Sequence, residues 1–221
     1  MKKVALIHTV KSVLTTFEES IKAAFSEEIK VSNILDDFLS NDANERGEFT
    51  VDNRNRLLMD IKTQELTGAD VIVTTCSTLT PIVEMVRPFV KVPVIAIDDA
   101  MARKGVTFGR KVLVMATAQS TVEPTKEKLQ IEAAKAGVEV EIDSLVNHEA
   151  FVAIKVLEAH KHDELLRASA REIKGYDCVI LAQASMAHME KEISEICQCP
   201  VISSPSLCIE EIREKLNRVN K

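Results

Sequence analysis

The chain contains one sequence plan twice, and this repeat limits the possible folds more than any other feature. Residues 69–101 read ADVIVTTCSTLTPIVEMVRPFVKVPVIAIDDAM, and residues 176–209 read YDCVILAQASMAHMEKEISEICQCPVISSPSLCI. In each copy an Asp precedes one short apolar segment and a Pro precedes a second. Cys76 lies 17 positions before Pro93, and Gln183 lies 17 positions before Pro200. Gln183 therefore takes in the second copy the position of Cys76 in the first.

The repeat extends toward the start of each copy. Val4 begins an apolar segment 66 positions before Asp70, and Val112 begins a similar one 65 positions before Asp177. We interpret this as an internal duplication of about half the chain. It predicts two lobes of the same architecture, at residues 1–105 and 106–205.

Strands alternate with helices throughout the chain. We expect strands at residues 3–8, 29–35, 71–73, 92–97, 111–117, 138–142, 178–182 and 201–203, and helices at 14–26, 53–67, 122–136, 148–174, 187–197 and 207–219. This alternation is typical of parallel sheets with right-handed crossovers. The predicted fold class is α/β, with two pseudo-symmetric Rossmann-like or flavodoxin-like lobes, each a parallel sheet flanked by helices. The polar segment at residues 40–50 is predicted to be a site loop or lid.

Composition excludes several classes of function. The net charge is −6, with one Tyr and no Trp, so nucleic acid and an anionic membrane surface are not expected partners. No apolar run approaches the roughly 18 residues of a membrane span, and no signal peptide is recognisable. Five cysteines at irregular spacing are typical of a reducing compartment, so we expect a cytoplasmic protein. The six glycines form no nucleotide-binding motif.

The turn around Cys76 has the composition of a reactive site. Cys76 follows an apolar strand, and Ser77 and Thr78 lead into the next helix. The start of a helix favours negative charge, so a thiolate or a substrate carboxylate would be stabilised there. Ligands of parallel sheets bind at the carboxyl ends of the strands. If the two lobes face each other, the active site lies in the cleft between them.

The residues of these turns resemble a known family. The segments that carry the resemblance are Thr75-Cys76-Ser77-Thr78, Pro93-Val94-Ile95 with Ala100, and Met115-Ala116-Thr117 with Thr121. The chain resembles the aspartate/glutamate/hydantoin racemase superfamily over essentially its whole length, and most clearly at these segments. The resemblance implies cofactor-independent chemistry at a carbon next to a carboxylate, with one thiol from each lobe flanking that carbon. It also implies that the C-terminal helix, residues 206–221, packs back on the first lobe.

The chain departs from that pattern at one position. Cys76 matches the first thiol, whereas Gln183 stands at the second and has no proton that titrates near neutral pH. We predict Cys76 as the acid or base and Gln183 as a group that orients the substrate. The predicted substrate-binding residues are His8, Thr75, Ser77, Thr78, Thr117, Thr121, Ala184 and Ser185.

Three functions stay open on these residues. A racemase of an amino acid such as aspartate or glutamate, or of a hydantoin, needs another second base, for which His8 and His188 are candidates. An enzyme with one thiol fits a decarboxylase or a maleate-isomerase-like reaction. The third alternative is a protein that binds a small carboxylate without turnover. A homodimer is the default expectation in each case.

Further predictions concern charged and metal-ligating residues outside the turns. Arg46, Asn53 and Arg56 either reach a substrate carboxylate or form a solvated surface. No metal site is predicted, because Cys197 and Cys199 lack a second ligand pair. The segment with His160 and His162 is predicted to be a solvated helix end.

Overall fold

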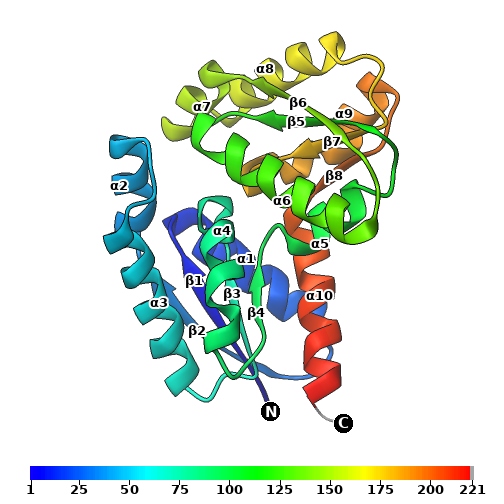
Figure 1. Cartoon of the computed structure of the whole chain (residues 1–221). Coiled ribbons are helices and arrows are strands. Elements are labelled where there is room, and N and C mark those ends of the chain that lie inside the picture. The colour runs from blue at the N-terminus through cyan, green and yellow to red at the C-terminus, as the bar shows by residue number, and fades with distance from the viewer. Residues whose placement is uncertain (220–221) are drawn as a thin grey trace. The chain divides into compact units, whose positions relative to one another are not determined.

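The computed structural model describes residues 1–219, which form two compact units. The first unit comprises Met1–Asp99 together with the described residues from Pro205 onward, and the second comprises Ala100–Ser204 (Figure 1). Each unit contains one four-stranded parallel sheet, in the orders β2-β1-β3-β4 and β6-β5-β7-β8. Within the described residues, no helix combines the length and the apolar character needed to cross a membrane.

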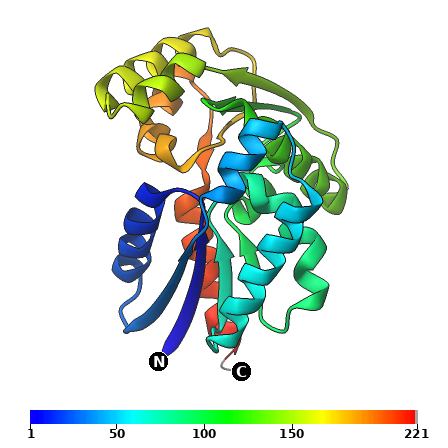
Figure 2. The same cartoon turned by 90° about the vertical axis from the view of Figure 1, so that its left-hand side faces the viewer.

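The sheet of the first unit is covered by helices on both faces. Its strands are β1 (Lys2–His8), β2 (Ile29–Leu35), β3 (Val71–Thr74) and β4 (Val94–Ala96). Its helices are α1 (Lys11–Ala24), α2 (Phe38–Arg46), α3 (Val51–Leu66), η1 (Ser77–Leu79), α4 (Thr80–Val86), η2 (Arg87–Phe89) and α10 (Ser204–Val219). Val4 and Leu6 pack with residues of α1 and α10, whereas Ala5 and Ile7 pack with residues of α3 and α4. Figure 2 shows α1 and α3 on opposite sides of this sheet. Burial of both faces explains why β3, β4 and most of β1 are apolar without alternation.

The second unit repeats this plan. Its strands are β5 (Lys111–Ala116), β6 (Glu141–Val146), β7 (Cys178–Leu181) and β8 (Val201–Ser203). Its helices are α5 (Asp99–Gly105), η3 (Gln119–Thr121), α6 (Val122–Ala136), α7 (His148–Lys155), α8 (Ala159–Glu172), η4 (Ala184–Met189) and α9 (Glu190–Cys197). One core cluster joins Leu113 and Val179 of the sheet to Leu166 of α8 and Ile193 of α9. Two four-stranded parallel sheets flanked by helices confirm the predicted fold class.

Equivalent residues of the two units make the same hydrogen bonds. The Asp70 backbone N–H donates to Lys3 O (2.9 Å) and the Asp70 carboxylate accepts from the Lys3 N–H (2.8 Å). Asp177 makes the same pair of bonds with Lys111, at 2.8 and 2.9 Å. The matching contacts show that the start of β3 is equivalent to the start of β7. Counting along both strands brings Cys76 and Gln183 into register, as the sequence repeat predicts.

The segment predicted as a lid or site loop forms the helix α2. Leu39 and Ala43, four positions apart, are buried on one face of it, and Gly47 ends it with φ +74°. Asp42 is buried as well, and its carboxylate accepts from Arg46 Nε (2.8 Å) and Asn53 Nδ2 (3.0 Å). The loop prediction was wrong because Asp42, the buried polar residue of this helix, finds hydrogen-bond partners in Arg46 and Asn53.

Two further elements differ from the prediction. The single helix expected at residues 148–174 is divided into α7 and α8 at Leu157, which takes the left-handed φ of +64°. The strand expected at residues 138–142 lies later, at Glu141–Val146. Its start is delayed because the Val138 N–H donates to Ala133 O (3.0 Å), so the chain after Gly137 closes α6 before β6 begins.

The division between the units lies within α5. The sequence places the first boundary after residue 105, whereas the units separate after Asp99. A Cβ atom at Gly105 would lie 2.8 Å from Ile180 and 3.3 Å from Leu129, so this end of α5 packs closely on the second unit. The chain returns to the first unit with α10, whose Ile212 and Leu216 are buried in that unit's core.

Candidate functional site

The turn after β3 holds Cys76 at the carboxyl end of this strand. Thr75 continues the strand, since its N–H donates to Ile7 O (3.0 Å). Cys76 has extended backbone angles and is the residue before η1, and Cys76 O accepts from the Leu79 N–H (3.0 Å). Its thiol is free and half-buried. The side chain therefore lies at the carboxyl end of a parallel strand, where such sheets bind ligands.

A chain of hydrogen bonds links Thr75, the residue before Cys76, to His8 and Asn33. His8 Nδ1 lies 2.8 Å from Thr75 Oγ1, and His8 Nε2 lies 3.1 Å from Asn33 Oδ1. Asn33 Nδ2 donates to Glu18 (2.6 Å), which orients the Asn33 amide with its oxygen toward His8. His8 Nε2 then carries the proton, and Nδ1 accepts from the Thr75 hydroxyl. Burial lowers the pKa of His8, against opposing effects of the Asn33 hydrogen bond and the Glu18 charge. His8 is thus a neutral, fully hydrogen-bonded residue directly behind the Cys76 turn.

The equivalent turn of the second unit is closed by Gln183. Gln183 Oε1 accepts from the Thr117 backbone N–H (2.6 Å), and Gln183 Nε2 donates to Thr117 Oγ1 (2.9 Å). The backbone angles of Gln183 match those of Cys76 to within about 15°, at φ −136°, ψ 139° against φ −135°, ψ 126°. The amide is therefore clamped to the residue after β5 by both of its polar atoms.

The other predicted binding residues surround these turns within their own units. Ser77 is buried and Thr78 is half-buried in η1. In the second unit Thr121 is buried and its hydroxyl donates to Ala118 O (2.8 Å), while Ala184 is half-buried and Ser185 is exposed in η4. The sequence prediction omitted Thr9 from the binding residues. Strand register makes Thr9 the equivalent of Thr117, and its buried hydroxyl has no hydrogen-bond partner among the described residues.

Arg46, Asn53 and Arg56 are engaged within the first unit. Asn53 and Arg46 bind Asp42, and Arg56 forms an ion pair and hydrogen bond with Asp36. Asp36 follows β2, and its N–H donates to His8 O (2.8 Å). Burial, the charge of Asp36 and a hydrogen bond to Asp36 together raise the pKa of the nearby Asp60 to about 6. An acid–acid pair supported by Arg56 thus lies beside the carboxyl end of β2, and no sequence motif marks it.

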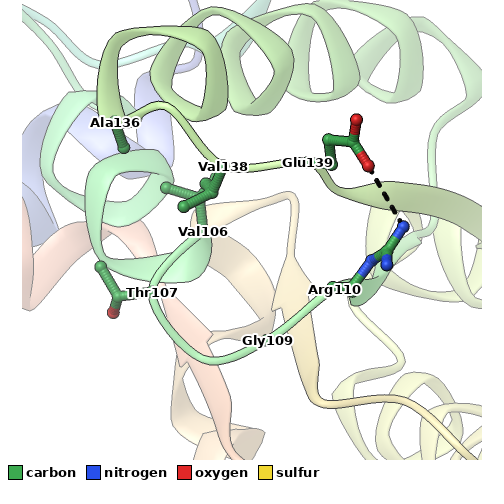
Figure 3. Close-up of a pocket in the computed structure, with 7 residues that line it drawn as sticks. All are labelled: Val106, Thr107, Gly109, Arg110, Ala136, Val138 and Glu139. Carbon is green, nitrogen blue, oxygen red and sulfur yellow. Dashed lines mark hydrogen bonds and ion pairs between the residues drawn. The ribbon is translucent and has the colours of Figure 1, made fainter.

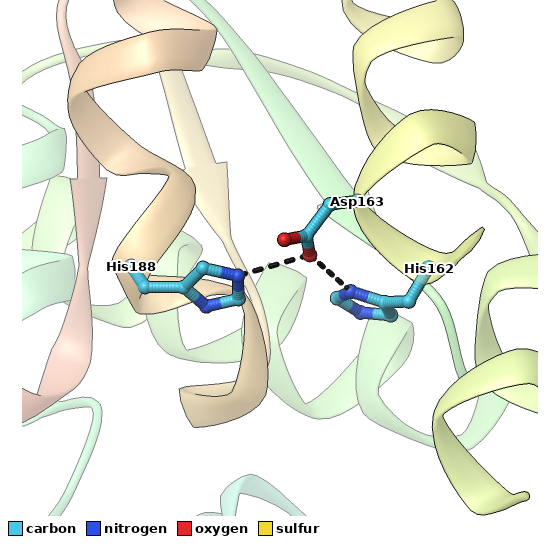
Figure 4. A group of neighbouring side chains, drawn as sticks. All are labelled: His162, Asp163 and His188. Carbon is cyan, nitrogen blue, oxygen red and sulfur yellow. Dashed lines mark hydrogen bonds and ion pairs between the residues drawn. The ribbon is translucent and has the colours of Figure 1, made fainter. Parts of the chain in front are cut away.

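The prediction of a solvated helix end is wrong for His162. His160 is exposed, but the His162 side chain has no exposed surface. His162 Nδ1 and His188 Nε2 each lie 2.9 Å from the same oxygen of Asp163 (Figure 4). His188, a candidate second base, is thereby tied to Asp163, although 55% of its side chain is exposed.

A cavity of about 580 Å³ lies elsewhere in the second unit. Its lining is mostly apolar, with an ion pair between Arg110 and Glu139 (3.3 Å) at one side (Figure 3). Four of the lining residues lie just before β5, and the other three lie at or just after the end of α6. The cavity is therefore near the amino end of β5. None of the predicted site residues lines this cavity.

Comparison with known proteins identifies the class of protein to which the chain is similar. Residues 7–212 match the sequence profile described as Asp/Glu/Hydantoin racemase. No curated protein sequence matches the chain.

Several solved structures share the fold. An aspartate racemase homologue from Pyrococcus horikoshii OT3 has a TM-score of 0.69 at 20% identity, covering 98% of this chain and 100% of that one. A glutamate racemase from Bacillus anthracis has a TM-score of 0.71 at 15% identity, covering 98% and 82%. An allantoin racemase from Pseudomonas fluorescens has a TM-score of 0.62 at 15% identity, covering 99% and 92%. At these identities the likeness shows the architecture and leaves the substrate open.

Proposed function

The chain belongs to the Asp/Glu/hydantoin racemase family, and on this premise we propose that it is a cofactor-independent enzyme of the isomerase type. The reaction takes place at a carbon next to the carboxylate of a small substrate, with Cys76 as the acid or base. The observation that carries the proposal is the position of the Cys76 thiol, free and half-buried after β3. A thiol held at the carboxyl end of a parallel strand can reach a bound ligand and exchange a proton with it.

The hydrogen bonds behind Cys76 support a rigid turn. Thr75 is held by its N–H bond to Ile7 O and by its hydroxyl bond to His8. A reacting group must be held close to its productive position, since small displacements cost large factors in rate. We assign His8 and Thr75 to this positioning role. Both ring nitrogens of His8 are engaged, which argues against His8 as the second base.

Proton transfer in this proposal takes place on one face of the substrate. Gln183 stands at the position equivalent to Cys76, and its amide neither accepts nor releases a proton near neutral pH. Its clamp to Thr117 leaves one amide hydrogen and one oxygen lone pair for a ligand. Gln183 therefore orients the substrate, together with the hydroxyls of Ser77, Thr78, Thr117, Thr121 and Ser185. Full racemisation then needs His188 or a water molecule as the second acid.

The clamped Gln183 also favours a second candidate. Decarboxylation next to a second acidic group leaves a carbanion that a single donor, the Cys76 thiol, can protonate. No base opposite Cys76 is needed, because the bond that breaks is the one to the departing carboxylate. A maleate-type isomerisation with Cys76 adding to the double bond likewise needs one thiol. The same binding groups would also serve a protein that holds a small carboxylate without turnover.

The family and the similar solved structures suggest which substrates to test first. The similar solved structures are named for aspartate, glutamate and allantoin. We therefore propose an amino acid or a hydantoin-type derivative as the first substrates to test. An unsaturated diacid and an aryl malonate represent the alternative reactions.

Proton NMR in D₂O distinguishes these functions. The purified chain is incubated with both enantiomers of aspartate and glutamate, a hydantoin, maleate and an aryl malonate. Deuterium at the carbon next to the carboxylate, with inversion, supports a racemase, and deuterium without inversion supports one-sided exchange by Cys76. Loss of a carboxyl group or of the cis geometry supports the second candidate. Saturable binding without any turnover would contradict both enzymatic proposals.

Substitution of the thiol tests its role. Cys76→Ala should lower the turnover rate by at least about 100-fold, the usual contribution of a general acid or base. Cys197→Ser is the matched control, because this thiol is also half-buried and lies outside both turns. Circular dichroism and melting temperature check that both variants fold. Equal turnover in Cys76→Ala and the wild type would exclude Cys76 as the reacting group.

A further inference from the structure

Three metal-ligating side chains meet in the second unit. His162 and Asp163 lie on α8, and His188 lies in η4. Their ligating atoms all lie within 4.8 Å of one another. Figure 4 shows both imidazole rings directed at one carboxylate oxygen of Asp163. The two rings are also roughly parallel, with centroids 6.2 Å apart and an angle of 26° between their planes.

We propose that His162, Asp163 and His188 bind a divalent transition-metal ion of the zinc type. Two imidazoles and one carboxylate are a ligand set that zinc, nickel and copper accept. The inference concerns a structural metal, and its test needs no substrate; a bound ion would occupy His188 Nε2 and leave water as the second acid of a racemase. It departs from the expectation of no metal site, because no motif in the sequence indicates that His162 and His188 converge.

Two of the three distances between the ligand atoms are close to those of a tetrahedral site, and the third, between the two imidazole nitrogens, is at most 4.8 Å. Bonds of about 2.0–2.2 Å place neighbouring ligand atoms of zinc about 3.3 Å apart. The two nitrogen-to-oxygen distances are 2.9 Å, so each must lengthen by a few tenths of an ångström to admit the ion. His188 can make this adjustment because more than half of its side chain is exposed. The same exposure lets water occupy the fourth position.

The burial of His162 limits the affinity that we expect. His162 is completely buried, and its Nε2 has no hydrogen-bond partner among the described residues. Arg167, a cation close to Asp163, is itself paired with Glu192 (2.5 Å). Metal binding through Nδ1 leaves the Nε2–H of His162 without an acceptor, so we expect a micromolar dissociation constant and not a nanomolar one.

Bound metal would join α8 to η4. The residue before η4 is Gln183, so the ion would tie the segment that begins at this side chain to a long helix of the same unit. This gives the metal a structural effect that can be measured without any substrate. Binding should raise the melting temperature of the whole chain.

Calorimetric titration with zinc tests the proposal. The titration uses the full chain with Cys197→Ser and Cys199→Ser, because these two thiols lie 3.4 Å apart and would bind zinc themselves. We expect one zinc ion whose affinity falls at least tenfold with Asp163→Asn and with His188→Ala. These two side chains are partly exposed, so both variants should fold. His160→Ala is the matched control, since His160 lies on α8 at high exposure and outside the cluster.

Thermal melting accompanies the titration. Zinc should raise the melting temperature of the Cys-substituted chain and of its His160→Ala variant, and leave that of His188→Ala unchanged. Affinity that is the same with and without His188, or that falls equally with His160→Ala, would refute the site. The absence of any binding at millimolar zinc would refute it as well.

Discussion

The clamp between Gln183 and Thr117 gives the sharpest test of the structure. Gln183→Ala removes both of its hydrogen bonds, at 2.6 and 2.9 Å. Each contributes about 1 kcal/mol net, and a buried donor left without a partner costs about 1–3 kcal/mol. Thr117 is completely buried, but Gln183 is half-buried, so water can replace part of the loss. We expect a decrease of about 2 kcal/mol in the free energy of unfolding.

Gln183→Glu is the matched variant for this prediction. Its carboxylate accepts from the Thr117 N–H, and the Thr117 hydroxyl can turn to donate to it as well. We therefore expect a loss below about 1 kcal/mol at pH 7. This variant also places a titratable group at the position equivalent to Cys76. If a missing second base is what limits inversion, Gln183→Glu should increase inversion relative to one-sided exchange.

Urea denaturation and amide hydrogen exchange measure the effect. Two compact units need not unfold together, so the exchange rate of the Thr117 amide provides a local measurement. A double-mutant cycle of Gln183→Ala with Thr117→Val should give a coupling energy of about 0.5–1.5 kcal/mol. Additive effects of the two substitutions, or unchanged protection of the Thr117 amide in Gln183→Ala, would refute the clamp.

Two other predictions concern stability. A Cβ at Gly109 (φ +155°) would lie 2.4 Å from the Asp177 carboxyl group, so Gly109→Ala should cost about 2–4 kcal/mol, seen as a fall in melting temperature. Gly137→Ala, at φ +67° in open space, should cost only about 1 kcal/mol, and equal losses would contradict the steric argument. The pKa of Asp60 is raised from 3.8 to about 6, so its contribution to stability is full below pH 4 and is lost as the pH rises through 6. Asp60→Asn cannot ionise and should gain on the wild type between pH 4 and pH 7, by no more than about 1 kcal/mol because Asp60 is half-exposed. Urea midpoints at several pH values check this, and a difference that moves the other way would show that Asp60 stays ionised.

Strands and their repeat could be predicted from the sequence, because strands buried on both faces are continuous apolar segments. Val71-Ile72-Val73 and Cys178-Val179-Ile180 carry that signal without tertiary information. The helix α2 could not be predicted in this way. Its polar residues favour a loop locally, and the burial of Asp42 depends on its contact with Asn53, eleven positions away. The break between α7 and α8 at Leu157 could not be predicted either, because leucine is not a residue type that favours a positive φ.

The candidate site, too, could be predicted from the sequence only in part. The equivalence of Cys76 and Gln183 follows from counting positions, and the strand register agrees with it. The partners of His8 could not be found, because Asn33 of β2 and Glu18 of α1, which holds the Asn33 amide, carry no motif. His162 was misjudged for a similar reason. Its polar neighbours indicate a solvated end, whereas Asp163 and His188 provide its environment inside the fold.

The return of α10 to the first unit affects the order in which the protein can fold during synthesis. Ile209, Ile212 and Leu216 belong to the core of the first unit, yet they follow Ala100–Ser204 in the sequence. All of Ala100–Ser204 has been made before these three apolar side chains. The second unit can therefore complete its core first, while the first unit must wait with the face of its sheet that α1 and α10 share only partly covered.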